Sequence, residues 1–289
     1  MQYLRPIRAW RLPRGVFELG HRTALMAVLN LTPDSFFAHS RLPTPDHALA
    51  SAERALEAGA HFLDLGAEST RPGATPLDPE AEWSRLRPAL DRIRHSLPHA
   101  TLSVDTRHAL TARRALDAGA DILNDVTGFE DSEMLAIAAR SRCGLIAMHH
   151  RGSFDTMHRL PPLADPLGEV SAGLATILYR IRSAGLDHER VVLDPGFGFG
   201  KNLDENFPIL RGLDSLHQFG CPVLVGVSRK SFLRNSPAQL ASARLAASLA
   251  ALTAALLAGA HIVRVHDCAA SAEAARLADC LIAPVNVRK

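Results

Sequence analysis

A phrase that occurs three times constrains the fold more than any other feature of the sequence. In each copy an Ala- and Leu-rich segment runs into Gly-Ala, and a short apolar run follows at once. The copies cover residues 55–64, 115–124 and 256–264. Gly takes the left-handed conformation that commonly ends a helix, so each copy indicates a helix that passes directly into a strand. The spacing between copies varies, which indicates repeated helix–strand joints rather than a solenoid.

Eight short apolar runs, each after such a stop, predict eight strands. They are Leu25–Asn30, Phe62–Leu65, Leu102–Asp105, Ile122–Asp125, Leu145–His149, Val191–Asp194, Val223–Ser228 and Ile262–His266. Helical patterns separate them, for example Asp46–Ala58, Glu80–Ser96, Leu110–Ala118, Ser132–Arg140, Pro166–Ala184, Asn206–Gln218 and Ala241–Leu257. Alternating strands and helices form parallel sheets, and eight such units close into a barrel. The sequence therefore predicts an α/β protein with one (β/α)8 TIM barrel domain over residues 21–289. A short N-terminal extension or hairpin, residues 1–20, would cover the barrel bottom.

Composition argues against other classes of protein. The net charge is +2 and Arg is spread along the chain, whereas nucleic-acid binders cluster their basic residues. The uncharged segment Leu245–Val263 is long enough to raise the question of a membrane span. It is mainly Ala and contains the helix stop Gly259-Ala260, so we interpret it as a packed helix and a strand. The four cysteines do not have the spacing of a zinc site, which favours a reducing compartment. The N-terminus has no apolar signal region, so we expect a cytoplasmic protein.

Polar residues gather where the predicted strands end. They are Asn30, Asp64, Asp105, Asn124, Asp125, His149, Asp194, Ser228, Lys230, Arg264 and His266. The C-terminal ends of barrel strands carry the active site in this fold. Loops are polar in any protein, which accounts for part of the set. Acids, amides and bases on most of the strands nevertheless favour a functional barrel mouth.

Two chemically different groups stand out among these residues. The carboxylates of Asp105 and Asp194, with Asn124 and Lys230, suit a flat heterocycle that has donor and acceptor edges. An internal network of ion pairs filling the barrel mouth is the alternative interpretation.

The second group is cationic and consists of Arg71, Arg264 and His266, with Thr70 and Asn30 nearby. Guanidinium groups bind phosphates through two hydrogen bonds, so this group suits a phosphate or pyrophosphate. Mg²⁺ would be held through oxygen ligands such as that of Asn30. Arg264 could instead pair with Asp267 or another acid.

The Gly-rich stretch 194–201 does not match a nucleotide-binding motif. It contains neither GxGxxG nor the P-loop pattern. We expect its alternating Gly and Phe residues to form a loop that offers aromatic walls to a planar ligand. No nucleophile elbow or comparable catalytic motif is present.

Eight phrases, in order along these strands, resemble the dihydropteroate synthase family. They are Asn30–Phe36, Glu68–Ala74, Ser103–Thr106, Asn124-Asp125, Met148-His149, Leu193–Lys201, Gly226–Phe232 and Arg264–Asp267. The resemblance implies an enzyme that joins 6-hydroxymethyl-7,8-dihydropterin pyrophosphate to p-aminobenzoate, giving 7,8-dihydropteroate and pyrophosphate, with Mg²⁺ assisting the loss of pyrophosphate. It also implies a homodimer.

The resemblance carries over particular residues. A pterin pocket would comprise Asp105, Asn124, Met148, Asp194, Phe199, Gly226 and Lys230. Pyrophosphate would lie against Asn30, Arg71, Arg264 and His266, with Asn30 also holding Mg²⁺. The p-aminobenzoate site would comprise Thr70, Arg71, Pro72, Phe199 and Ser231.

The chain departs from the family pattern in its first loop, where Phe37-Ala38-His39-Ser40 replaces the usual Ser-Asp-Gly-Gly. Two alternatives therefore stay open. One is a related pterin-domain methyltransferase with a corrinoid partner, which would need neither Ser69–Gly73 nor Ser228–Phe232. The other is an inactive paralogue that binds pterin without turnover.

Overall fold

Eight parallel strands surround the centre of the molecule. The computed structural model describes residues 5–32, 44–69, 76–153, 156–234 and 240–282. The sheet order is β8-β7-β6-β5-β4-β3-β10-β9, and a bridge between Leu193 and Val223 joins its two edges. The strands are β3 (Ala24–Asn30), β4 (Phe62–Gly66), β5 (Thr101–Asp105), β6 (Ile122–Asp125), β7 (Gly144–Met148), β8 (Val191–Asp194), β9 (Leu224–Val225) and β10 (Ile262–Val265). The predicted (β/α)8 barrel is confirmed.

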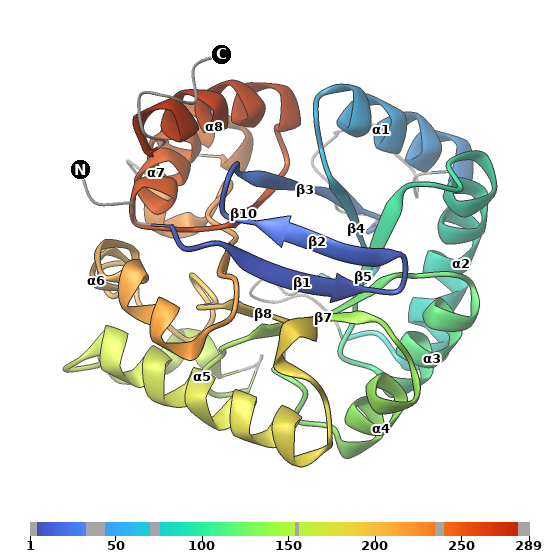
Figure 1. Cartoon of the computed structure of the whole chain (residues 1–289), viewed down its shortest axis with the longest axis horizontal. Coiled ribbons are helices and arrows are strands. Elements are labelled where there is room, and N and C mark those ends of the chain that lie inside the picture. Colours follow the sequence, from blue (N-terminus) through green and yellow to red (C-terminus); the bar gives the residue numbers. More distant parts are fainter. Residues whose placement is uncertain (1–4, 33–43, 70–75, 154–155, 235–239, 283–289) are drawn as a thin grey trace.

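Helices surround this sheet, as Figure 1 shows. They are α1 (Pro45–Glu57), α2 (Pro79–Ser96), α3 (Ala109–Asp117), α4 (Ser132–Arg140), α5 (Pro166–Ser183), α6 (Asn206–Arg211), α7 (Leu245–Leu257) and α8 (Cys268–Ile282). Short polar side chains begin several of them, since Asp78 and Asp131 accept hydrogen bonds from the first-turn N–H groups of α2 and α4. Within the described ranges no helix is both long and apolar enough to cross a membrane.

A hairpin of β1 (Arg8–Leu12) and β2 (Gly15–Leu19) lies across one end of the barrel (Figure 1). Its Trp10 and Leu19 are fully buried among apolar residues of the barrel strands. The Trp10 ring nitrogen donates a hydrogen bond to the carbonyl oxygen of Arg190 at 2.9 Å, just before β8. The hairpin therefore closes the end at which the strands begin.

The interior of the barrel changes from apolar to polar along the strands. The hairpin packs on an apolar layer formed by Met26, Phe62, Ile122, Ile146, Val192, Leu224 and Ile262. Side chains two residues apart on a strand share a face, so the next inward layer comes two residues later. That layer consists of Val28, Asp64, Asn124, Met148, Asp194, Gly226 and Arg264. The barrel interior therefore has an apolar layer next to the hairpin and a polar layer nearer the C-terminal ends of the strands. We call this polar half of the interior the cup and the apolar layer its floor.

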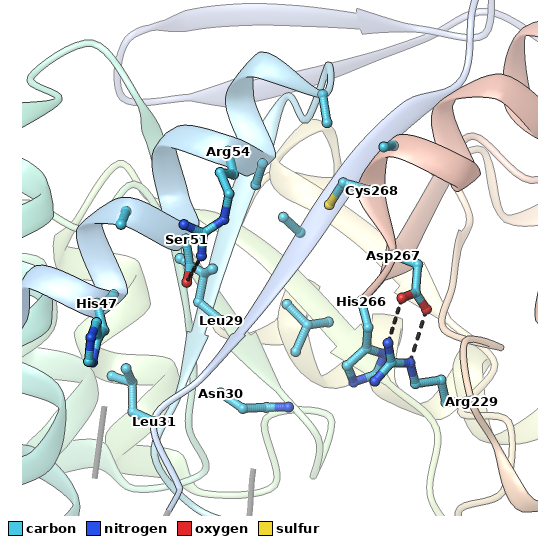
Figure 2. A pocket seen from close by; sticks show the side chains of 17 residues that line it. Leu29, Asn30, Leu31, His47, Ser51, Arg54, Arg229, His266, Asp267 and Cys268 are labelled. Carbon is cyan, nitrogen blue, oxygen red and sulfur yellow. Dashed lines mark hydrogen bonds and ion pairs between the residues drawn. The ribbon is translucent and has the colours of Figure 1, made fainter. Parts of the chain in front are cut away.

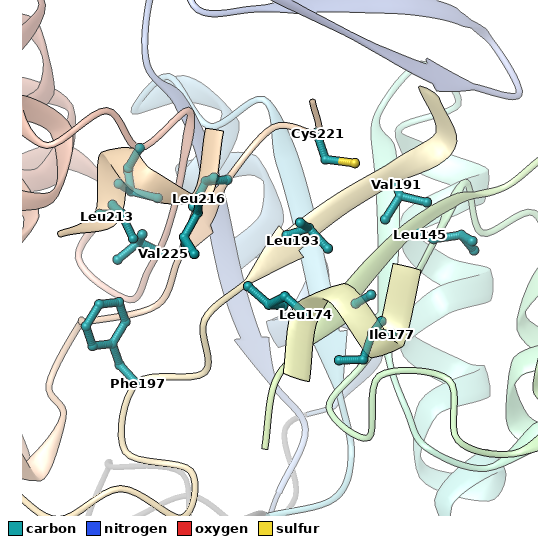
Figure 3. Packing of buried hydrophobic residues seen from close by; sticks show 14 of the residues in the cluster. Leu145, Leu174, Ile177, Val191, Leu193, Phe197, Leu213, Leu216, Cys221 and Val225 are labelled. Atoms are coloured by element: carbon teal, nitrogen blue, oxygen red, sulfur yellow. The ribbon is translucent and has the colours of Figure 1, made fainter. Parts of the chain in front are cut away.

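Outward-facing strand residues form the larger core beneath the helices. In Figure 3, Val191 and Leu193 of β8 face Leu174 and Ile177 of α5. Full burial of such side chains stabilises a fold by about 1.5–3 kcal/mol each. This outer core fixes which residues of each strand face the helices. Because strand residues alternate, it also fixes which side chains point into the cup.

Three predicted elements are shorter than expected. The helix expected at Ala241–Leu257 begins at Leu245, after a 3-10 helix, Ala241–Arg244. The strand expected at Val223–Ser228 is reduced to Leu224–Val225, because the chain leaves the sheet at Gly226 and turns at Arg229, whose φ is 59°. The helix expected at Asn206–Gln218 ends at Arg211 and continues as a 3-10 helix, Leu213–Phe219. A Cβ on Gly212 would lie 2.4 Å from the end of the Leu167 side chain of α5, so a larger residue at the break would need Leu167 to move.

Candidate active site

An ion-pair network holds the inner wall of the cup. Arg264 Nε lies 2.6 Å from Asp64 Oδ2, and its Nη2 lies 2.7 Å from Asp105 Oδ2. Asp64 also accepts hydrogen bonds from the Ser103 hydroxyl at 2.5 Å and from the Asn124 amide at 3.2 Å. One guanidinium thus links β4 and β5 to its own strand, β10, across the intervening β3. Within the described part of the chain, Arg264 Nη1 has no hydrogen-bond partner.

Burial dominates the charges of this network. It raises the pKa of Asp105 to about 7, although Arg264 opposes the shift. Burial also opposes the charge on Arg264, but Asp64 and Asp105 together hold its pKa above the ordinary value. The alternative of an ion-pair network is therefore partly right, because Arg264 pairs with acids inside the barrel. Asp267, the other acid considered for it, pairs with Arg229.

Asp194, Lys230 and Phe199 form the opposite wall. Asp194 is buried and accepts a hydrogen bond from the Gly196 N–H at 2.7 Å. Burial raises its pKa. Burial lowers the pKa of Lys230 to about 8, and Asp194 opposes that shift. The Lys230 Nζ lies 4.2 Å from the centre of the Phe199 ring, a distance at which a cation interacts with an aromatic face.

Lys201 fixes the Gly-rich loop that carries this wall. Its buried Nζ donates to the carbonyl oxygens of His149, Gly196 and Phe199 at 3.3, 2.8 and 3.1 Å. Burial lowers its pKa to about 7. This role is not evident from the sequence, because the three carbonyl partners become neighbours only in the folded loop.

A strained turn positions Lys230. Arg229 adopts a φ of 59°, which is uncommon for a residue with a side chain. Its N–H donates to the Ser248 hydroxyl at 2.8 Å, and its guanidinium binds Asp267. These contacts hold the backbone conformation, so Lys230 leaves the turn at a fixed point beside β8.

Asn30 and His266 lie at the outer end of the cup. Both line a cavity of about 570 Å³ that extends between α1 and α8, and Figure 2 shows their side chains facing the space between β3 and β10. His266 Nδ1 lies 3.0 Å from the Ser228 hydroxyl. Burial, with Arg264 nearby, lowers the pKa of His266 to about 3. The expectation that His266 is a cation is therefore wrong at neutral pH, because this ring is desolvated and faces other cations.

The residues at this end fit a magnesium ion that is shared with a substrate. Among the residues that the structure describes, no group of three His, Cys, Asp or Glu side chains could hold a metal alone. Mg²⁺ commonly takes one or two protein oxygens and completes its shell with water and substrate phosphates. The Asn30 amide offers one such oxygen at the mouth.

Some strand-end residues face away from the cup. Asp125 accepts hydrogen bonds from the N–H groups of Thr127 and Phe129, so it shapes the loop after β6. His149 packs against Gly173 of α5, where a Cβ would lie 2.2 Å from its ring. The Gly-rich loop supplies one aromatic wall rather than two, because Phe197 is buried in the outer core and stacks on Phe232. Figure 3 shows Phe197 near Leu213 and Val225.

Other predicted residues have no described surroundings. Thr70, Arg71 and Pro72 lie outside the described residues, and so do Phe37, Ala38, His39 and Ser40. Ser231 is described and exposed, next to Lys230. Asp105, Asn124, Met148, Asp194, Gly226, Lys230 and Arg264 do converge on one cup.

Comparisons with known proteins bear on what this cup holds. The family described as pterin binding enzyme matches residues 26–266. A dihydropteroate synthase from Synechocystis is 39% identical over 274 residues, which cover 93% of this chain and 94% of that protein.

The chain belongs to the dihydropteroate synthase family.

Solved structures of dihydropteroate synthases share its architecture. The Xanthomonas albilineans enzyme with 4-aminobenzoic acid has a TM-score of 0.86 at 35% identity, covering 96% of this chain and 99% of that one. The Burkholderia cenocepacia enzyme complexed with 7,8-dihydropteroate has a TM-score of 0.84 at 37% identity, covering 96% and 97%. The cup also contains Asp64, which the sequence placed at the barrel mouth but assigned to no ligand, and Ser103, which the sequence did not indicate. The alternation of strand residues was the signal that could have placed Asp64 beside Asp105.

Proposed function

We propose that this protein is a dihydropteroate synthase, a transferase that joins 6-hydroxymethyl-7,8-dihydropterin pyrophosphate to p-aminobenzoate and releases pyrophosphate. The observation that carries the proposal is the polar cup above a dry floor, in a chain of this family. Asp194, Asn124 and Lys230 offer acceptors and donors at the depth at which a flat heterocycle would lie. No corrinoid partner is required, and the Ser69–Gly73 and Ser228–Phe232 phrases argue against the methyltransferase alternative.

The reaction breaks one bond and forms another at the pterin methylene carbon. The carbon–oxygen bond to pyrophosphate breaks, the aryl nitrogen attacks the same carbon, and that nitrogen loses a proton. We assign Asp105, Asn124, Met148, Asp194, Phe199, Gly226 and Lys230 to the pterin. Asp194 would hold the donor edge of the ring, and the negative charge deep in the cup would stabilise positive charge that develops at the methylene.

The leaving group would lie at the outer end of the cup. Arg264 Nη1, His266 and Asn30 would contact pyrophosphate there, with Arg71 from the neighbouring loop. A bound Mg²⁺, held by the Asn30 oxygen, would supply charge that stabilises the departing phosphates. A neutral His266 suits this position as a hydrogen-bond donor. The p-aminobenzoate would lie against Thr70, Arg71, Pro72, Phe199 and Ser231.

Gly226→Val tests this placement by filling the cup without disturbing its charges. A Cβ on Gly226 would meet no atom within 4 Å, so the variant should fold normally. The added isopropyl group would occupy space assigned to the pterin. We expect calorimetry to show pteroate binding weakened at least roughly tenfold, as overpacking costs about 1–3 kcal/mol. If the variant kept normal thermal stability and bound pteroate with unchanged affinity, the pterin would not lie against Gly226.

We further propose that two chains form a homodimer through α7 and α8, which lie side by side (Figure 1). Leu245 and Leu257 on α7, and Leu277 and Leu281 on α8, are large apolar side chains that remain exposed. Large apolar side chains that stay exposed on two adjacent helices support the proposal that this face is an interface. We expect sedimentation equilibrium to give twice the chain mass of 31.2 kDa. A mass of one chain at micromolar concentration would contradict the dimer.

We propose a cytoplasmic location, which the state of the thiols supports. Cys143, Cys221, Cys268 and Cys280 are all unpaired, and the first two are buried. Disulfides are rare in reducing compartments, so unpaired cysteines support our proposal of a cytoplasmic enzyme.

A further inference from the structure

Outside the barrel wall, a buried carboxyl of α2 contacts the end of β5. Glu82 lies in the first turns of α2, and only 1% of this residue is exposed. Its Oε2 accepts a hydrogen bond from the Thr106 hydroxyl at 2.7 Å. Thr106 is buried as well, and it follows Asp105, the last residue of β5. The carboxyl therefore holds the chain directly after the residue that β5 places in the cup.

Thr106 makes three hydrogen bonds that fix where β5 ends. Its N–H donates to the Asn124 carbonyl oxygen at 3.0 Å, which extends the pairing of β5 with β6 beyond Asp105. Its hydroxyl donates to Glu82 and accepts a hydrogen bond from the His108 N–H at 3.1 Å, where α3 begins. One side chain thus ties the end of this strand pair to α2 and α3.

The carboxyl of Glu82 is costly to bury. Burial raises its pKa to about 7, while the hydroxyls of Thr111 and Thr106 oppose the shift. A neutral and an ionised carboxyl can both accept a hydrogen bond from a hydroxyl, so the bond to Thr106 persists in either state. An apolar side chain of similar size would fill the same space without this cost. Stability alone therefore does not account for a carboxyl at this position.

We propose that Glu82 and Thr106 are positioning residues for the pterin, because together they fix the backbone that carries Asp105 and Asn124. This inference rests on the proposed function, which assigns those two residues to the pterin. Arg264 holds the Asp105 carboxylate from inside the cup, whereas Thr106 holds the chain from outside it. Neither Glu82 nor Thr106 would touch a substrate. Their loss should weaken pterin ligands and spare p-aminobenzoate.

The test compares Thr106→Val with Thr111→Val as a matched control. Thr111 is also buried with its hydroxyl near Glu82, but it lies on α3 and donates to the Pro79 carbonyl at 3.4 Å. For Thr106→Val we expect the Kd for pteroate and the KM for the pterin pyrophosphate to rise on the order of tenfold, because a hydrogen bond to a buried carboxyl is lost. The KM for p-aminobenzoate should stay within about twofold. Thr111→Val should change none of these values.

Further variants separate the hydrogen bond from the packing. Thr106→Ser and Glu82→Gln keep the donor and the acceptor, so each should bind pteroate within about twofold of wild type. Glu82→Met removes the acceptor and should reproduce Thr106→Val, and the double variant should bind pteroate no more weakly than either single one. If Thr106→Val and Glu82→Met only lowered the melting temperature, or raised both KM values equally, the inference would be overturned.

Hydrogen exchange at Thr106 provides a readout that needs no turnover. In Glu82→Met the Thr106 amide should exchange on the order of tenfold faster, because its side chain is no longer held and its bond to Asn124 opens more often. The same amide should keep its wild-type exchange rate in Thr111→Val. Unchanged exchange in Glu82→Met would show that Glu82 does not position Thr106. A wild-type protein without activity would refute the proposed function, whereas the exchange result would still decide whether Glu82 holds the end of β5.

Discussion

Asp194→Asn is expected to weaken pteroate binding by roughly two to four orders of magnitude, because hydrogen bonds to a charged group are worth about 1.5–3 kcal/mol each. The carboxylate would accept two donors from the pterin edge. Asparagine keeps the side-chain volume but replaces one acceptor with a donor. It would also remove the negative partner that opposes the lowering of the Lys230 pKa by burial. Calorimetry with pteroate measures the affinity directly.

The control for this variant lies at the other end of the same strand. Asp187→Asn, before β8, changes an exposed acid that pairs with Arg11. It should leave pteroate binding unchanged, and both variants should retain the wild-type circular dichroism spectrum. If Asp194→Asn folded normally and bound pteroate with wild-type affinity, the pterin would not lie against Asp194.

Arg264→Met is expected to lower the free energy of unfolding by about 3–5 kcal/mol at pH 8, because it leaves buried acids without their partner. Asp64 is fully buried and Asp105 lies beside it. The same variant should abolish turnover, since it removes a contact of the pterin wall and one of the pyrophosphate. It should therefore weaken pteroate as well as the pyrophosphate-bearing substrate.

The loss of stability in Arg264→Met should depend on pH in a defined direction. Burial already raises the folded-state pKa of Asp105 to about 7, and removing Arg264 raises it further. A folded state that binds more protons than the unfolded state loses stability as the pH rises. Both folded states hold the Asp105 proton near pH 5, so the part of the deficit that comes from Asp105 should be absent there and should grow as the pH rises above about 7. Urea unfolding at pH 5 and at pH 8 measures it, with Arg114→Met, on an exposed pair, as the control. A deficit that is independent of pH would contradict the ion-pair account.

The sequence was sufficient to predict the barrel and most of the cup. Helix stops at Gly59, Gly119 and Gly259 mark the joints, and each is followed by a strand as predicted. Asp105, Asn124 and Asp194 could be placed because strand ends converge on one face in this fold.

The remaining features depend on contacts between distant residues. Arg264 meets Asp64 across 200 positions, and no local pattern specifies which acid it binds. The carbonyl partners of Lys201 become neighbours only when the loop folds, so no local pattern indicates that its side chain is buried. Phe197 and Phe199 share one Gly-Phe pattern, yet one packs outward and the other lies beside Lys230. In a strand, residues two positions apart face the same side. Phe197 and Phe199 lie in an irregular loop, so this rule does not apply to them.

The most direct test of the function is a product assay with the full chain. Purified protein would receive the pterin pyrophosphate, p-aminobenzoate and Mg²⁺, with each omitted in turn, and 7,8-dihydropteroate and pyrophosphate would be quantified together. We predict equal amounts of both products only when all three components are present. Tight pteroate binding without either product would contradict the account, and it would identify the chain as an inactive pterin-binding paralogue.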